Sequence, residues 1–158
     1  MTGEDHSPHP HDSSSHENAA AEVAVIELLR TRPGLESLRP RTVELVAGVK
    51  INVDGVTDAD DYFVEVLAHN GKLIGGQKRK VAMDILKLVA VHERYPGARL
   101  VVALTGHKAA TSVAGWVRFV AESNGIQIEA IELGREWEVR LDAARAKQTI
   151  GMQQIKRT

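Results

Sequence analysis

The chain has 158 residues, enough for one domain with a substantial core, and its 43% hydrophobic and 26% charged residues are typical of a globular protein. It contains no cysteine, which excludes disulfides and thiolate metal sites, and no apolar run approaches the roughly 18 residues that span a membrane. The formal net charge of −1 gives no global attraction to nucleic acid or an anionic membrane. The N-terminal sequence also lacks the basic-then-apolar order of a signal peptide, so we expect a cytoplasmic protein without a membrane partner.

The charge is unevenly distributed along the chain. Residues 1–40 carry a net charge of −4 and residues 41–158 a net charge of +3. A mildly basic folded part is compatible with a nucleic-acid partner without requiring one.

The N-terminal segment is predicted to be a disordered leader over residues 1–16, ahead of a single domain over residues 17–158. The leader is rich in Ser, Pro and Asp and has almost nothing to bury. It also contains four histidines, and because nothing rigid would fix their geometry we interpret them as solvated rather than as metal ligands: His6, His9, His11 and His16.

Apolar periodicity predicts the next elements. A helix is predicted over about residues 17–32, ended by Pro33-Gly34. The β-branched alternation of residues 41–53 predicts strand, broken or bulged at Gly48, and a polar turn with three aspartates separates it from a strand over residues 62–68.

The second half of the chain alternates helices and strands. A long amphipathic helix is predicted over residues 77–95, a strand covered on both faces over residues 98–104, a helix over residues 108–124, a strand over residues 126–133 and a final helix from about residue 135. The inward residues are expected to be Val81, Ala82, Ile85, Leu86, Leu88 and Val89 on the first of these helices, Val113, Trp116, Val117 and Val120 on the second, and Trp137 and Leu141 on the last. The order α-β-β-β-α-β-α-β-α predicts an α/β protein with a mixed sheet flanked by helices.

Two acids stand inside apolar strand patterns, Asp54 on the second predicted strand and Glu65 on the third. This order and this pair resemble the PD-(D/E)XK phosphodiesterase superfamily, the restriction-endonuclease-like fold, over roughly residues 20–105. The resemblance implies that both acids bind Mg²⁺ or Mn²⁺ and that a lysine two residues after the glutamate helps to place or activate the attacking water. Leu67 occupies the lysine position. Holliday-junction resolvases of this superfamily carry a further metal-site glutamate on the leading helix, which corresponds here to Glu22, with Glu27 as the alternative.

The chemistry of phosphodiester hydrolysis supports the same interpretation. The reaction places negative charge on non-bridging oxygens, and a hard cation held by carboxylates offsets that charge and lowers the pKa of a bound water. Two carboxylates on adjacent strands would hold the cation and leave positions open for substrate and water.

The helix after the third strand offers replacements for the missing lysine. Lys80 or Lys78 would take the role of the lysine, and Gln77 would orient water or substrate, as a glutamine on this helix does in many members of the superfamily. Val81 stands where one large branch has an aromatic residue. The polar positions of this helix lie three to four residues apart and share one face: Gln77, Lys80, Asp84 and Lys87.

The resemblance also implies partners. Contacts to a nucleic-acid backbone would come from Lys72, Lys78, Arg79 and Lys80. Symmetric pairing is common in this fold and implies a homodimer.

Simpler interpretations remain open for each motif. Asp54-Gly55 is a common turn pair. Glu65 would be solvent-facing on an edge strand, although it shares a face with apolar neighbours, where an unpartnered glutamate is unfavourable. Thr105, ahead of a predicted helix, is either a helix cap or part of a phosphate site, and His69 is expected to be partly exposed at a strand end.

Three functions follow from the sequence. The first is a metal-dependent nuclease-like protein that hydrolyses nucleic-acid phosphodiester bonds. The second is a catalytically inactive module on the same fold that binds nucleic acid or protein in a regulatory role. The third is an unrelated α/β interaction domain.

Overall fold

The computed structural model describes residues 10–155, with side chains over residues 15–147 and at residues 149, 150 and 153. The elements follow in the order α1 (Pro10–Arg30), β1 (Arg39–Val46), β2 (Val49–Val56), β3 (Tyr62–Leu67), α2 (Gly76–Arg94), β4 (Arg99–Thr105), α3 (His107–Ser112), α4 (Gly115–Ser123), β5 (Ile126–Ile131) and α5 (Arg135–Ile155). The protein is therefore an α/β protein with a five-stranded mixed sheet flanked by helices. No helix within residues 10–155 is both long and apolar enough to cross a membrane.

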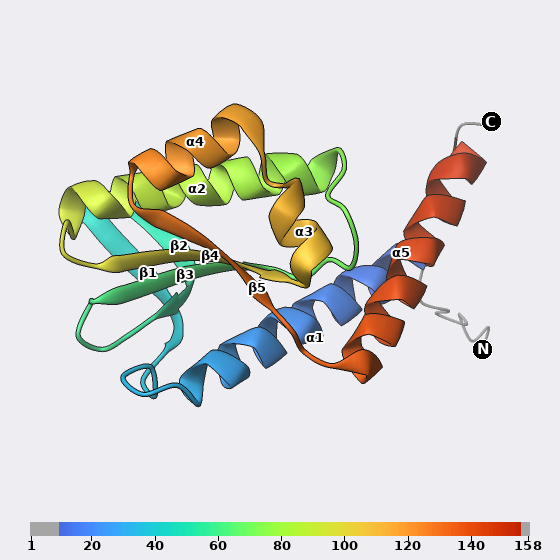
Figure 1. Cartoon of the computed structure of the whole chain (residues 1–158), viewed down its shortest axis with the longest axis horizontal. Coiled ribbons are helices and arrows are strands. Elements are labelled where there is room, and N and C mark those ends of the chain that lie inside the picture. Colours follow the sequence, from blue (N-terminus) through green and yellow to red (C-terminus); the bar gives the residue numbers. More distant parts are fainter. Residues whose placement is uncertain (1–9, 156–158) are drawn as a thin grey trace, which may run out of the picture.

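The sheet has the strand order β1-β2-β3-β4-β5. β1, β2 and β3 are antiparallel neighbours, whereas β3, β4 and β5 run parallel. Helices α2 and α4 cover one face of the sheet and α1 covers the other, with α5 beside α1 at the end of β5 (Figure 1). Parallel strands joined by helical crossovers are covered on both faces, which explains why β3 is buried along its whole length.

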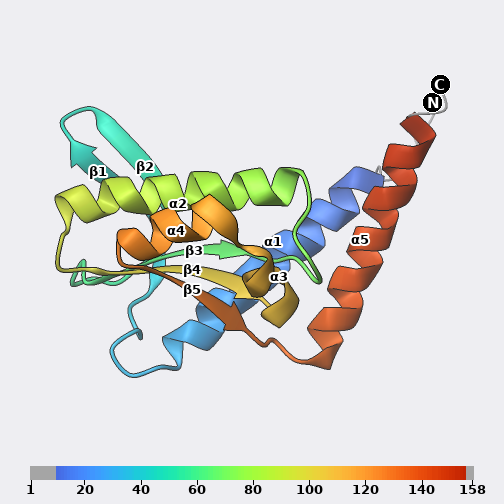
Figure 2. The same cartoon turned by 45° about the horizontal axis from the view of Figure 1, so that its top comes forward.

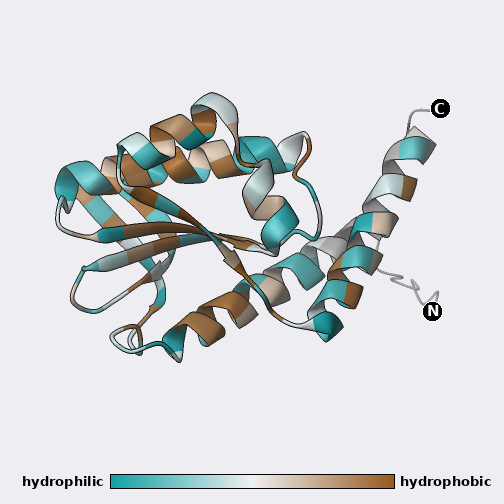
Figure 3. Cartoon of the chain, in the orientation of Figure 1, coloured by the Kyte–Doolittle hydropathy of each residue, from teal (hydrophilic) through white to brown (hydrophobic). Residues whose placement is uncertain are grey.

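Side-chain alternation divides the core into two layers. Phe63 and Leu67 of β3 pack with the apolar side of α2, whereas Val64 and Val66 pack with α1. In Figure 3 the central strands between the helices are largely brown, the colour of hydrophobic residues. The face of β3 towards α2 is interrupted at its middle by Glu65.

The β1–β2 hairpin is joined to the rest of the sheet over a short distance. β2 pairs with β3 only through Gly55 with Val64 and Val56 with Phe63, and residues 49–53 of β2 pair with β1 alone. The hairpin turns at Gly48, whose φ of 80° is one that glycine adopts without strain. Beyond the short ladder the hairpin leaves the sheet and rises past α2 (Figure 2).

Gly55 lies within β2, so it is not part of a turn. An added Cβ would lie 2.7 Å from Cγ1 of Val64 and 2.9 Å from Cδ1 of Ile26. The absence of a side chain at Gly55 therefore lets α1 and β3 pack closely at the point where the hairpin joins the sheet.

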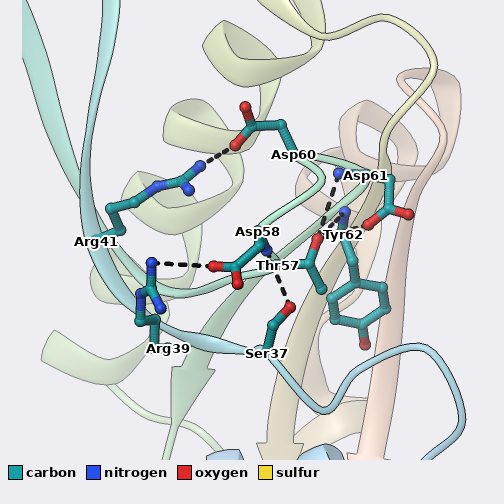
Figure 4. A network of polar contacts seen from close by, with 8 residues as sticks. All are labelled: Ser37, Arg39, Arg41, Thr57, Asp58, Asp60, Asp61 and Tyr62. Carbon is teal, nitrogen blue, oxygen red and sulfur yellow. Dashed lines mark hydrogen bonds and ion pairs between the residues drawn. The ribbon is translucent and has the colours of Figure 1, made fainter.

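A polar network fastens the base of the hairpin to the turn between β2 and β3 (Figure 4). Arg41 pairs with Asp60, and NH2 of Arg39 lies 3.0 Å from Oδ1 of Asp58. The further hydrogen bonds of this network join Ser37, Thr57, Asp58, Asp61 and Tyr62. The predicted polar turn therefore has a structural role, in which β1 arginines hold Asp58 and Asp60 and Thr57 holds Asp61.

The N-terminal helix begins earlier than predicted. α1 starts at Pro10, seven residues before the start predicted at about residue 17. Proline suits the first turn of a helix because the N–H that it lacks would have no intrahelical partner there. His6 and His9 lie outside the described residues, as does the side chain of His11, and His16 is exposed.

The predicted helix over residues 108–124 is two helices. The chain is extended at Val113 and Ala114 and continues through Gly115 at φ 62°, which separates α3 from α4. Arg118 of α4 stabilises the break, since Nε donates to the carbonyl of Val113 at 2.5 Å and NH2 to that of Ala110 at 2.8 Å.

Two predicted core positions are wrong. Trp116 is 74% exposed on α4 and Leu86 is 60% exposed on α2. Val81, Ile85 and Leu88 are buried as predicted.

Candidate functional site

Glu65 lies at the centre of β3 and is 1% exposed, so it is not a solvent-facing residue of an edge strand. Nζ of Lys87, from α2, lies 2.8 Å from its Oε1. The same oxygen has no hydrogen bond of good geometry from any described residue, so we describe the contact with Lys87 as an ion pair. A carboxylate buried in an apolar layer is stable only with such a partner.

Asp54 lies on β2, immediately before the two residues that pair with β3. Its Oδ2 accepts the backbone N–H of Val66 at 2.8 Å. The interpretation of Asp54-Gly55 as a turn is wrong, because both residues belong to β2. The two predicted acids are therefore brought to adjacent strands, with Asp54 bonded to the residue that follows Glu65.

Helix α2 contributes two lysines and a further acid. Nζ of Lys80 donates to the carbonyl of Val66 at 3.1 Å and to Oδ2 of Asp84 at 3.1 Å. Asp84 is 4% exposed, and its Oδ1 lies 4.0 Å from Nζ of Lys87. The helical spacing of these residues presents all three to β3.

Glu22 of α1 completes the group. It is half-buried and close enough to Lys80, Asp54 and Asp84 for their charges to affect its pKa. Glu27, the alternative, is exposed and paired with Arg30 at 3.2 Å. We call Glu22, Asp54, Glu65 and Asp84 the acidic cluster.

Burial and mutual repulsion shape the electrostatics of the acidic cluster. Burial and the neighbouring Asp54 raise the pKa of Glu65 to about 8. Burial also raises the pKa of Glu22 and of Asp84, against the opposite effect of Lys80 on each. The pKa of Lys80 is itself raised, because the attraction of Asp84, Glu22 and Asp54 outweighs its burial. Groups with pKa values shifted in this way often mark functional sites.

A divalent cation at the acidic cluster would need oxygen ligands from its carboxylates. Within the described side chains, no three His, Asp or Glu residues form a ready metal-binding group. Mg²⁺ commonly takes only one or two carboxylates from a protein and completes its shell with water and substrate phosphate. Asp54 and Glu65 are oxygen donors of the type that Mg²⁺ and Mn²⁺ accept, although the buried Oε1 of Glu65 already faces the ammonium group of Lys87 at 2.8 Å.

Other predicted site residues lie outside the acidic cluster. Oε1 of Gln77 accepts the backbone N–H of Ile74 at 3.4 Å, at the start of α2. Lys72, Lys78 and Arg79 are exposed. Lys78 lines a pocket of about 160 Å³ between α2 and the α3–α4 segment, with Leu73, Val81, Ser112, Val113, Ala114 and Val117.

Two predictions near the strand ends need correction. His69 is 6% exposed rather than partly exposed, and burial lowers its pKa. Thr105 is the last residue of β4, and the residue that caps α3 is Gly106. The Thr105 hydroxyl accepts the N–H of His69 at 2.8 Å and donates to its carbonyl at 3.2 Å, so it ties β3 to β4.

Sequence reasoning placed Asp84 and Lys87 on the polar face of α2 but gave them no role in the site. The available signal was their spacing beside the apolar stripe, since Asp84 lies four residues after Lys80 and Lys87 lies three residues after Asp84. What the sequence lacked was the rotation of α2, which turns this side of the helix towards Glu65 and away from solvent.

Comparison of the chain with models of known protein families, with curated proteins and with solved structures found no match.

Proposed function

We propose that this protein is a metal-dependent nuclease-like protein that hydrolyses nucleic-acid phosphodiester bonds, on a restriction-endonuclease-like variant of its α/β fold. The observation that carries the proposal is the meeting of Asp54 and Glu65 on adjacent strands, with Glu22 and Lys80 beside them. Ionisable groups whose pKa values are shifted by burial and by specific charge partners are enriched at functional sites, which supports the proposal.

In the proposed site, Asp54 and Glu65 hold Mg²⁺ or Mn²⁺ and Glu22 assists. The bound cation would offset charge on the non-bridging oxygens and lower the pKa of a water. Lys80 takes the role of the motif lysine, which the apolar side chain of Leu67 cannot fill. Its side chain is 42% exposed and its ammonium group is fixed by Val66 and Asp84, so it presents a positive charge at the solvent side of the acids.

The exposed basic residues support binding of a polyanion. Lys72, Lys78 and Arg79 lie before and at the start of α2, the helix that also carries Lys80. They would contact the phosphate backbone of the nucleic acid through charge and without sequence readout. Pairing of two copies to cut both strands is part of the same proposal.

The alternative is a catalytically inactive binding module on the same fold. The ion pair between Lys87 and Glu65 favours it, because the lysine places a permanent positive charge against the acid that the cation would need. The two functions differ in whether phosphodiester bonds are broken.

Cleavage of plasmid, single-stranded DNA and RNA with Mg²⁺ or Mn²⁺ tests the proposal. Wild-type protein should cut, and Asp54→Asn and Glu65→Gln should each lower the rate by about 100-fold or more, since each removes a charged ligand with little change of shape. Glu22→Gln should also lower the rate, whereas Glu27→Gln on the exposed side of the same helix should not.

Equal cutting by the wild type and both acid variants would overturn the assignment of the site. If none of the proteins cuts but the wild type binds nucleic acid in a mobility-shift assay, the binding module is the correct function.

A further inference from the structure

We propose that Lys87 is a built-in counter-ion of Glu65, which a divalent cation has to displace, so that this lysine sets the cation affinity of the acidic cluster. The inference rests on the proposed metal site and adds its regulation.

The contact between the two side chains is the geometric basis. Nζ of Lys87 lies 2.8 Å from Oε1 of Glu65, on an acid that is otherwise enclosed by the apolar layer between β3 and α2. The ammonium group stands against the carboxylate oxygen that a metal ion would use. Two cations held this close to one oxygen repel each other strongly in a poorly solvated site.

Lys80 is bound differently. It donates hydrogen bonds to Val66 and Asp84, whereas the contact of Lys87 with Glu65 is an ion pair without a hydrogen bond of good geometry. Lys87 is therefore the lysine that is not held by hydrogen bonds of good geometry, and it is the one that contacts Glu65, the predicted metal ligand.

Lys87 also has a second partner within reach. Oδ1 of Asp84 lies 4.0 Å from its Nζ, three residues earlier on the same helix. A small rotation of the lysine side chain towards Asp84 frees Oε1 of Glu65 and keeps the ammonium group paired.

The test measures Mn²⁺ binding by titration calorimetry at one fixed pH and salt concentration. Lys87→Met removes the charge and preserves most of the side-chain length, and it should bind Mn²⁺ about tenfold more tightly than wild type. Arg94→Met, which removes an exposed positive charge from the far end of the same helix, is the matched control and should change the affinity by less than about twofold.

Two further variants keep the experiment decisive if Lys87→Met folds poorly. Lys87→Gln should show the same gain, and thermal unfolding identifies which variants are folded. Adding Glu65→Gln to Lys87→Met should abolish the gain, because the lysine acts through this carboxylate. If folded Lys87 variants bind Mn²⁺ no more tightly than wild type, or if none of the proteins binds it, the inference is overturned.

Cleavage is measured separately, so the two proposals fail in different ways. A wild type that cuts, with Lys87 variants that gain no affinity, overturns the counter-ion role alone. Tighter binding by the Lys87 variants without cleavage by any protein supports the counter-ion role and overturns the nuclease.

Discussion

The side chains of Asp54 and Lys80 make the hydrogen bonds to the backbone of Val66 that a longer β2 would have made. Oδ2 of Asp54 accepts the N–H of Val66 at 2.8 Å, and Nζ of Lys80 donates to the carbonyl of Val66 at 3.1 Å. In an antiparallel ladder the N–H and C=O of one residue point to the same neighbouring strand. Since β2 has already left β3 at this level, two side chains complete the edge and are thereby fixed beside Glu65.

The structural and chemical roles of Asp54 can be separated by two substitutions. Asp54→Ala leaves the N–H of Val66 without its partner and should lower the free energy of unfolding by about 1–3 kcal/mol. Asp54→Asn keeps a carbonyl oxygen for that N–H and should unfold within about 1 kcal/mol of wild type while losing Mn²⁺ binding. Urea unfolding and calorimetry check the pair. A large loss of stability in Asp54→Asn would contradict the proposed hydrogen-bonding role.

The raised pKa of Glu65 predicts an unusual dependence of stability on pH. With a folded pKa of about 8 against an ordinary value of 4.5, the folded protein binds more protons than the unfolded chain between these values. The contribution of Glu65 to stability is therefore fully present below pH 4.5 and is lost as the pH rises through 8. Without divalent cations, this group should lower the free energy of unfolding by about 2–3 kcal/mol between pH 6 and pH 8.5.

Glu65→Gln is the control that isolates this group from the other acids. Its amide does not titrate, so the decrease between pH 6 and pH 8.5 should be smaller than in wild type by most of that amount. Urea unfolding at the two pH values measures both proteins. Parallel pH profiles for wild type and Glu65→Gln would show that Glu65 titrates below this range in the folded protein.

The close packing at Gly55 gives a prediction about the core. Gly55→Ala places a methyl group against Val64 and Ile26 and should lower the free energy of unfolding by about 1–3 kcal/mol. Gly97→Ala, where an added Cβ meets nothing within 4 Å, should leave it unchanged within about 1 kcal/mol. Equal effects of the two substitutions in thermal unfolding would contradict the packing role of Gly55.

Arg118 gives a prediction about the break between α3 and α4. Its planar group bonds two carbonyls at once, which a lysine does not reproduce, so Arg118→Lys should destabilise the protein by about 1–2 kcal/mol. Glu122→Ala removes only an exposed partner of the same arginine and should change stability by less than about 0.5 kcal/mol. Chemical unfolding compares the two, and similar losses would assign the effect to the ion pair instead.

Much of the fold is readable from the sequence because its signals are local. Periodicity and punctuation by Pro and Gly placed the three early strands, α2 and the start of α5 close to where they lie. The division of α3 from α4 was missed because its one local signal is Gly115, a single glycine within an apolar pattern, and the bonds of Arg118 that hold the break join residues across it. Exposed Trp116 and Leu86 could not be distinguished from core residues, because an apolar residue beside a buried stripe has the same local pattern.

The sequence predicted the acids of the site and a lysine from α2, Lys80, but it did not predict Lys87 as the partner of Glu65. Asp54 and Glu65 stood out because polar residues interrupt apolar strands, and Glu22 was placed by the resemblance alone. The partner of Glu65 depends on the rotation of α2 over the sheet, which brings Lys87 to the acid from 22 positions further along the chain. No local pattern records that contact. The sequence showed that Leu67 lacks the lysine of the motif and pointed to Lys80 or Lys78 as its replacement, but it did not single out Lys87.

The short ladder between β2 and β3 has a mechanical consequence. Two residue pairs and the arginine–aspartate fastening at its base join the hairpin to the sheet, and Asp54 is the first residue beyond the ladder. Val43 and Val53 of the same hairpin are buried in the core layer beneath α2, whereas Val46 and Val49 at its far end are exposed. A force on the exposed end would therefore reach the sheet through this layer and through the junction at which Asp54 bonds to Val66. The hairpin that rises past α2 is thus anchored at the residue that lies beside Glu65.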